Sequence, residues 1–183
     1  MGPAGHGTPD PEIPLTGGWG SVRTIVDVGG GTGAMLAEVL RARSGVRGTL
    51  VDLPRTVAKA RETFKAAGVA DRATIVGQSF FDPLPAGADL YLLRKVINDW
   101  PDREAAAILR RCAEAARPDG RVVVLGGIVP DGTPRALSIE MVLLGGRHRT
   151  VSEFRDLARG AGLGVMAVKR QSPRYHVVEC RPT

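Results

Sequence analysis

The sequence contains few of the residues on which several classes of protein depend. Of its 183 residues, 4% are aromatic and only two are cysteine. Recognition of single-stranded nucleic acid relies on stacking against aromatic side chains, and disulfide or zinc frameworks need several cysteines at fixed spacings. No uninterrupted apolar run approaches the length of a membrane-spanning helix. These shortages argue against a disulfide-rich, membrane-embedded or nucleic-acid-binding protein.

The net charge of +6 does not change that expectation. The arginines are scattered over separate predicted helices and loops, whereas a phosphate-binding surface needs them clustered. We therefore predict solvated helix faces and no nucleic-acid partner. Neither the cysteines nor any group of Asp, Asn and Glu has the arrangement of a metal site, so no metal is predicted.

Residues 1–20 are rich in glycine and proline and lack the charged-then-apolar layout of a signal peptide. We predict a disordered leader over 1–20, with Trp19 at the domain edge, followed by a single domain over 21–183. Cys112 and Cys180 are predicted to be reduced packing residues of a cytoplasmic protein.

A glycine-rich stretch, TIVDVGGGTGAML over residues 24–36, dominates the pattern. It predicts a buried strand, a tight glycine loop and a helix whose first N–H groups face a ligand. Asp27 would repel a pyrophosphate but attract a cationic amino group. Asp52 ends the next apolar run, where an acid holds ribose hydroxyls. This combination favours S-adenosylmethionine over a dinucleotide, although the glycines alone fit both.

Strand and helix patterns alternate along the rest of the chain. Strands are predicted at 48–51, 73–76, 89–93 and 121–125, helices at 55–67, 102–116 and 151–161, and a terminal hairpin from 164–169 and 175–179. Such alternation predicts an α/β fold with a parallel sheet covered by helices on both faces.

Three ordered blocks carry a family resemblance: DVGGGTG at 27–33, VDLP at 51–54 and LLRKVINDWPD at 92–102. They resemble the S-adenosylmethionine-dependent O-methyltransferases that tailor bacterial aromatic polyketides, relatives of the plant caffeate-type enzymes. The resemblance implies a Rossmann-like, seven-stranded class I methyltransferase sheet, mostly parallel with an antiparallel last strand. It also implies that the family's usual N-terminal dimerisation and lid domain is absent. Either the chain is an excised catalytic domain, or a separate polypeptide of that kind, or a homodimer, completes the acceptor pocket.

The resemblance also assigns residues to ligands. Those assigned to S-adenosylmethionine, and to the product S-adenosylhomocysteine, are Asp27, Gly29, Gly30, Gly31, Gly33, Asp52, Leu53, Ser79, Phe80 and Arg94. Those predicted to face a small aromatic substrate are Trp100, Glu140, Met141 and Leu144. Core packing is an equal alternative for Phe80, and a solvated charge is an equal alternative for Arg94. Ordinary core or surface packing is at least an equal alternative for Trp100, Met141 and Leu144.

The expected catalytic base is missing. Asn98 stands where the family has a histidine, and an amide cannot accept a phenol's proton. A supporting acid of the family falls at Gly126 or Gly127, and His148 replaces a second one. His148 is either a relocated base or a partly solvated loop residue.

The leading prediction is methylation of an aromatic hydroxyl of a small natural product, driven by proximity and desolvation. Three alternatives stay open. Some relatives that carry Asn at the position of Asn98 bind the cofactor but catalyse hydroxylation or decarboxylation. The chain could also be a catalytically silent partner subunit, or, on the glycine pattern alone, a nicotinamide dehydrogenase.

Overall fold

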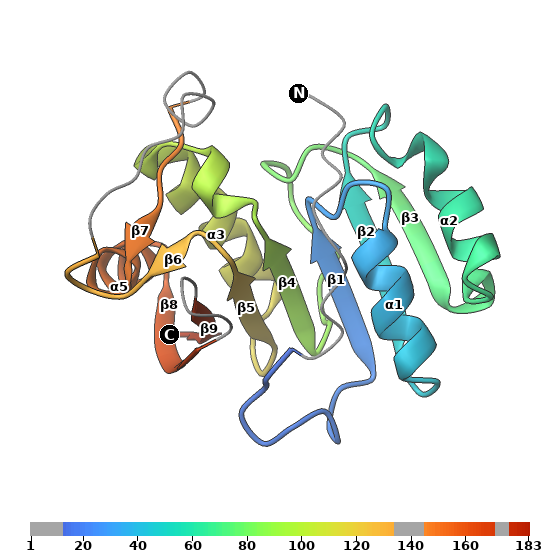
Figure 1. Ribbon diagram of the computed structural model, residues 1–183, viewed down its shortest axis with the longest axis horizontal. Helices are drawn as coiled ribbons and strands as arrows, with labels where there is room; N and C mark the ends of the chain where they lie inside the picture. The colour runs from blue at the N-terminus through green and yellow to red at the C-terminus, as the bar shows by residue number, and fades with distance from the viewer. Residues whose placement is uncertain (1–12, 134–144, 171–175) are drawn as a thin grey trace.

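A seven-stranded sheet runs through the middle of the molecule in the computed structural model, which describes residues 13–133, 145–170 and 176–183 (Figure 1). In spatial order the strands are β3 (Ala73–Gly77), β2 (Arg47–Asp52), β1 (Thr24–Val28), β4 (Leu90–Arg94), β5 (Arg121–Leu125), β9 (His176–Pro182) and β8 (Leu163–Arg170). The order runs outward from β1 in both directions, so ligand-binding loops meet where the order reverses.

Strand direction agrees with the predicted fold. Strands β1 to β5 pair in parallel, whereas β9 is antiparallel to both β5 and β8. The antiparallel last strand is therefore confirmed. Because β1 to β5 all point the same way, their carboxyl ends lie together at the upper edge of the sheet in Figure 1.

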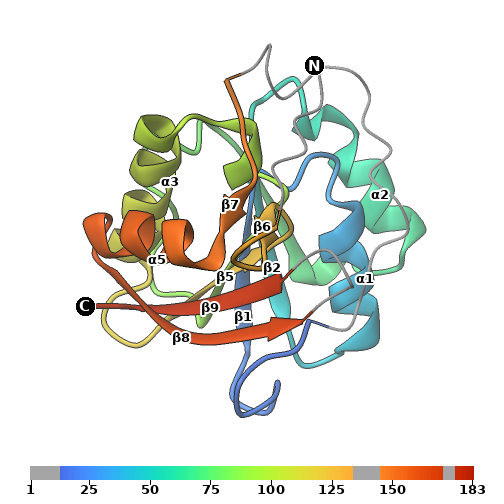
Figure 2. The same ribbon diagram turned by 60° about the vertical axis from the view of Figure 1, so that its left-hand side comes forward.

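Within the described ranges, four helices cover the two faces of the sheet. Figure 2 shows α1 (Ala34–Ala42) and α2 (Ala60–Ala66) on one side, and α3 (Asp102–Ala115) and α5 (Val151–Gly160) on the other. Alternate residues of β4 enter the two cores: Leu90 and Leu92 face α1 and α2, while Tyr91 and Leu93 face α3 and α5. A parallel sheet buried on both faces explains the unbroken apolar strand sequences. None of these described helices has the length and apolar composition needed to cross a bilayer.

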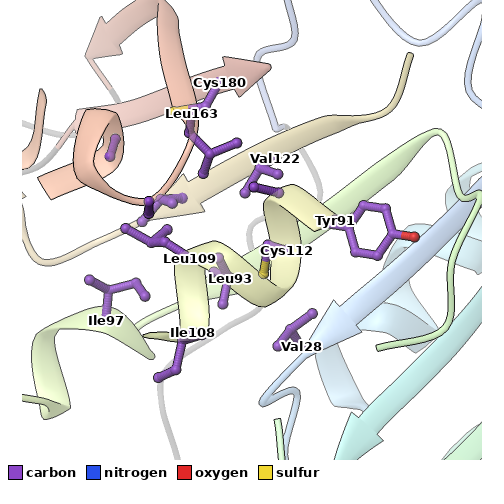
Figure 3. Packing of buried hydrophobic residues seen from close by; sticks show 14 of the residues in the cluster. Val28, Tyr91, Leu93, Ile97, Ile108, Leu109, Cys112, Val122, Leu163 and Cys180 are labelled. Atoms are coloured by element: carbon purple, nitrogen blue, oxygen red, sulfur yellow. The ribbon is translucent and has the colours of Figure 1, made fainter. Parts of the chain in front are cut away.

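The core under α3 contains both cysteines (Figure 3). Cys112 on α3 and Cys180 on β9 are fully buried and free, as predicted. Burial raises the thiol pKa of both, so neither behaves as a reactive thiolate. Tyr91 fills the same layer, and its hydroxyl donates to the carbonyl oxygen of Ala115 at 2.9 Å.

Two local features differ from the predictions. The helix expected from residue 55 begins as a short 3-10 turn, Val57–Lys59, and becomes α-helical only at Ala60. A small parallel sheet of β6 (Ile128–Val129) and β7 (Arg149–Thr150) lies beyond the end of β5 and was not predicted. Two-residue strands carry no detectable periodicity, so sequence patterning misses them.

The expectation of a disordered leader is wrong for residues 13–20, the dark blue start of the described chain in Figure 1. Ile13 and Leu15 are buried in the core beneath α1. The Trp19 indole N–H donates to the carbonyl oxygen of Ile13 at 3.0 Å, and the Arg43 guanidinium lies 3.9 Å from the centre of the Trp19 ring. The surrounding glycines and prolines masked this apolar anchoring at the sequence level. Residues 1–12 lie outside the described part of the chain.

Candidate active site

The glycine loop connects β1 to α1 at the carboxyl edge of the sheet. Gly31 and Gly33 have φ angles of +66° and +79°, a region that costs other residues free energy. A Cβ at Gly33 would lie 2.6 Å from the Phe64 ring, whereas one at Gly31 would meet nothing within 4 Å. The loop is therefore held by packing at Gly33, and Gly31 faces open space.

Asp52 ties the end of β2 to this loop. Its carboxylate accepts the Gly31 N–H at 2.9 Å and the Leu53 N–H at 2.7 Å. The side chain is largely buried, and the Gly29 N–H donates to the neighbouring Val51 carbonyl at 2.8 Å. The structure thus brings together four residues that the sequence assigned to one ligand: Asp52, Leu53, Gly29 and Gly31.

Asp27 lies fully buried at the tip of β1. Neither carboxylate oxygen has a hydrogen-bond partner among the described residues. A Cβ at Gly30 would lie 2.4 Å from its Oδ2 atom, so the glycine permits this close approach. Burial raises the pKa of Asp27 to about 7, against the lowering effect of Arg94 and with a further rise from Asp52. Buried acceptors are normally paired, so Asp27 is suited to a donor supplied by a ligand.

Arg94 ends β4, the strand beside β1. Its positive charge acts on Asp27 and opposes the increase in the Asp27 pKa. Arg94 is half-buried and forms no hydrogen bond or ion pair within the described ranges. The guanidinium therefore contributes charge to the site without being committed to a protein partner there.

Three aromatic rings form a cluster next to the loop. Phe80 and Phe81 follow β3, and their ring centres lie 6.0 Å and 5.0 Å from that of Trp100, both in edge-on contact. Phe80 also reaches the glycine loop, since a Cβ at Gly29 would lie 3.6 Å from its ring. The Ser79 hydroxyl oxygen accepts the Phe81 N–H at 3.2 Å. Phe80 thus stands between the predicted cofactor loop and the predicted substrate residue Trp100; Phe81 was not predicted as a site residue.

Asn98 occupies a short 3-10 helix, Ile97–Asp99, after β4. Its amide N–H₂ donates to the Asp99 carboxylate at 2.8 Å. Its Oδ1 atom is buried and has no donor in the part of the chain that the structure describes. Two glycines make room for the residue: a Cβ at Gly127 would lie 2.6 Å from the Asn98 Cβ, and one at Gly146 would lie 2.4 Å from its carbonyl oxygen.

The segment that holds His148 is dominated by arginines. His148 is half-buried between Arg147, which pairs with Asp102 and Glu153, and the buried Arg149. Arg149 was missed by the sequence reasoning, which singled out His148 in the same block. Glu140, Met141 and Leu144 lie outside the described residues, so their assignment to the substrate stays a prediction. The described ranges hold no group of three or more His, Cys, Asp or Glu side chains that could bind a metal ion.

The strand order, the glycine loop after β1 and the acid at the end of β2 define the Rossmann-like class I methyltransferase fold. An O-methyltransferase domain model matches residues 17–164, and the chain belongs to that family.

Named relatives agree with this assignment. The chain is 43% identical over 152 residues to 2,7-dihydroxy-5-methyl-1-naphthoate 7-O-methyltransferase of Streptomyces carzinostaticus, covering 81% of this chain and 46% of the relative. It is 44% identical over 154 residues to aclacinomycin 10-hydroxylase RdmB of Streptomyces purpurascens, covering 80% and 41%. The chain thus spans less than half the length of these two relatives.

A solved structure shows the same architecture. The O-methyltransferase NcsB1 from neocarzinostatin biosynthesis, in complex with S-adenosylmethionine and 2-hydroxy-5-methyl naphthoic acid, superposes with a TM-score of 0.81 at 40% identity. The match covers 91% of this chain and 50% of that one.

Proposed function

We propose that this chain is the cofactor-binding domain of an S-adenosylmethionine-dependent O-methyltransferase that acts on an aromatic hydroxyl of a small natural product. The observation that carries the proposal is the buried carboxylate of Asp27, which has no hydrogen-bond partner among the described residues and lies beside a glycine loop anchored by Asp52. The O-methyltransferase family and the naphthoate 7-O-methyltransferase among the relatives support it.

The residues at the edge of the sheet fit this cofactor. When bound, S-adenosylmethionine supplies an electrophilic methyl group on a cationic sulfonium. Asp27 would accept the hydrogen bonds of its amino group, which satisfies the two carboxylate oxygens that lack donors within the described residues. Asp52 would accept from the ribose hydroxyls, because each carboxylate oxygen that now holds one backbone N–H has a further lone pair. Phe80 and Ser79 would contact the adenine.

On the acceptor side, Asn98 positions the acceptor rather than deprotonating it. Asn98 can hydrogen-bond a phenol but cannot take its proton. Proximity and orientation can contribute about 7–11 kcal/mol, whereas general base catalysis typically contributes about 10²–10⁴-fold in rate. We therefore propose that the acceptor ionises largely by its own acidity, between Asn98 and the Phe80–Phe81–Trp100 cluster. An N-terminal-domain-like polypeptide or a second copy of the chain would close the pocket.

Paired alanine variants separate the two candidate catalytic residues. We expect Asn98→Ala to lower turnover at every pH, because an orienting hydrogen bond is lost. His148→Ala should leave turnover unchanged across pH 6 to 9 if His148 is a loop residue, and should remove one limb of the pH profile if it is a relocated base.

A second candidate function rests on one comparison and one substitution. RdmB, at 44% identity, is named a hydroxylase, and Asn98 removes the base that a methyltransferase ordinarily uses. In this candidate dioxygen would supply the oxygen atom and an external reductant the electrons, while the bound cofactor would contribute its positive charge and keep its methyl group. Mass spectrometry of products made with methyl-labelled cofactor distinguishes the two: a labelled product supports methyl transfer, and an unlabelled hydroxylated product supports the alternative.

Titration calorimetry tests the cofactor assignment before any acceptor is known. We expect S-adenosylmethionine and S-adenosylhomocysteine to bind, and NAD not to bind. The Asp27→Asn variant keeps the shape of the side chain but loses its charge, so it should bind both ligands more weakly. Absence of binding to the unmodified chain would overturn the proposal and favour a catalytically silent subunit.

A further inference from the structure

Arg149 carries a buried charge, and its side-chain hydrogen-bond partners all lie between Ile97 and Asp102. Its side chain is 2% exposed, and burial of a guanidinium is costly unless every donor finds an acceptor. Nη1 donates to the Ile97 carbonyl at 2.7 Å, Nη2 to the Trp100 carbonyl at 2.8 Å, and Nε to the Asp102 carboxylate at 2.9 Å. The guanidinium thus donates to two backbone carbonyls of one short segment and to the acid that follows it.

The two carbonyls flank Asn98 and Asp99 on either side. A 3-10 turn of three residues has little rigidity of its own, so its position depends on what holds its ends. The Arg149 backbone adds a second connection, because its N–H donates to the Gly127 carbonyl at 2.9 Å and Arg149 pairs with Ile128 across the small sheet. Arg149 therefore links the segment after β4 to the segment after β5.

We propose that Arg149 is a positioning residue, whose guanidinium sets the placement of Asn98 and Trp100 against the cofactor loop. The inference rests on the proposed function. Trp100 meets Phe80 in edge-on contact, and Phe80 lies beside Gly29, so a shift of the Trp100 backbone changes the distance between acceptor and cofactor. A planar fork can hold three acceptors in fixed directions, and a lysine ammonium on a flexible stem cannot.

The chain offers a matched control two residues away. Arg147 pairs with the same Asp102 carboxylate at 2.7 Å and with Glu153 at 3.0 Å. Its hydrogen bonds to the described residues reach only side chains, and it is more exposed, at 29%. Arg149→Lys and Arg147→Lys therefore make the same chemical change beside the same acid, and only the first removes the backbone carbonyl contacts.

The test uses the two tryptophans of the chain, labelled as 5-fluorotryptophan and read by fluorine NMR. A Trp19→Phe variant assigns the resonances. We expect Arg149→Lys to shift or broaden the Trp100 resonance and leave that of Trp19 in place, whereas Arg147→Lys should leave both. S-adenosylhomocysteine affinity should change by less than about threefold in both variants, and kcat should fall about 10²-fold only in Arg149→Lys, the loss typical of a small misplacement.

Other outcomes have distinct meanings. An unmoved Trp100 resonance in Arg149→Lys, or the same shift in Arg147→Lys, would overturn the positioning role. If neither the parent chain nor any variant turns over an acceptor, the proposed function fails. The NMR comparison still decides whether Arg149 sets the position of Trp100. If Arg149→Lys does not fold, Asp102→Asn serves instead: it weakens the ion pairs but keeps both carbonyl contacts, so a large Trp100 shift there would contradict the proposal.

Discussion

Asn98 fits into its position because Gly127 has no side chain. A Cβ at Gly127 would lie 2.6 Å from the Asn98 Cβ and 2.9 Å from its Oδ1, and Gly127 has a φ angle of +74°. The family resemblance places an acid at Gly126 or Gly127 and a histidine at Asn98. In this structure any side chain at Gly127 would collide with Asn98 unless the backbone moved.

This contact predicts that two glycine-to-alanine substitutions lower the stability of the fold by different amounts. Gly127→Ala introduces both a strained φ angle, which costs about 1–3 kcal/mol, and a collision with Asn98. Gly132→Ala has the same kind of strain, with φ at +80°, but its Cβ would meet nothing within 4 Å. Urea unfolding should therefore show a larger loss of stability for Gly127→Ala. Equal losses would mean that the loop moves away from Asn98 at no cost.

Ionisation of Asp27 predicts pH-dependent cofactor affinity. Its pKa is raised to about 7, mainly by burial, and only the carboxylate form attracts the cofactor's ammonium group. Below pH 7 the fraction of protein with an ionised Asp27 falls. The dissociation constant of S-adenosylhomocysteine should therefore be about tenfold larger at pH 6 than at pH 8. Calorimetry at both pH values measures this ratio. A ratio near one in the unmodified chain, or an unchanged ratio in Asp27→Asn, would contradict it.

The same group predicts the sign of a stability change without ligand. The folded pKa of Asp27, about 7, lies above the ordinary value of 3.8 that an aspartate has in the unfolded chain. Its contribution to stability is present below pH 4 and is lost as the pH rises through 7. Asp27→Asn removes this loss, so the variant should be more stable than the parent at pH 8 by an amount on the order of a few kcal/mol. Its advantage should shrink at pH 5; the opposite trend in urea unfolding would refute the buried-carboxylate account.

Loss of one Asp52 acceptor should weaken binding more than it weakens the fold. Asp52→Asn retains one carbonyl oxygen for a backbone N–H but gives up the charge and the second acceptor. Hydrogen bonds to a charged group contribute about 1.5–3 kcal/mol, so affinity for S-adenosylhomocysteine should fall about 10- to 100-fold. Calorimetry measures the affinity, and thermal unfolding without ligand supplies the comparison. A large drop in unfolding temperature with unchanged affinity would assign Asp52 to the fold alone.

Much of the fold was predictable because its signals are local. A run of apolar residues bounded by glycine or proline predicts a strand or helix from neighbours along the chain, and the alternation of these elements restricts the sheet to few topologies. The glycines at 29–33 and the strand-end acids Asp27 and Asp52 were predictable for the same reason. Each lies at the end of a predictable strand, and parallel strands place their carboxyl ends together.

The remainder depended on contacts between distant segments. Arg149 binds the Ile97 carbonyl across 52 positions of sequence, and Glu179 accepts from the Thr16 N–H across 163. No local pattern marks an arginine that will be buried or a leader segment that will pack. The sequence by itself determined the sheet, the glycine loop and the two acids, because these follow from neighbouring residues. Only the tertiary structure decided that Gly127 makes room for Asn98 and that Arg149 holds its segment, because packing sets which distant groups meet.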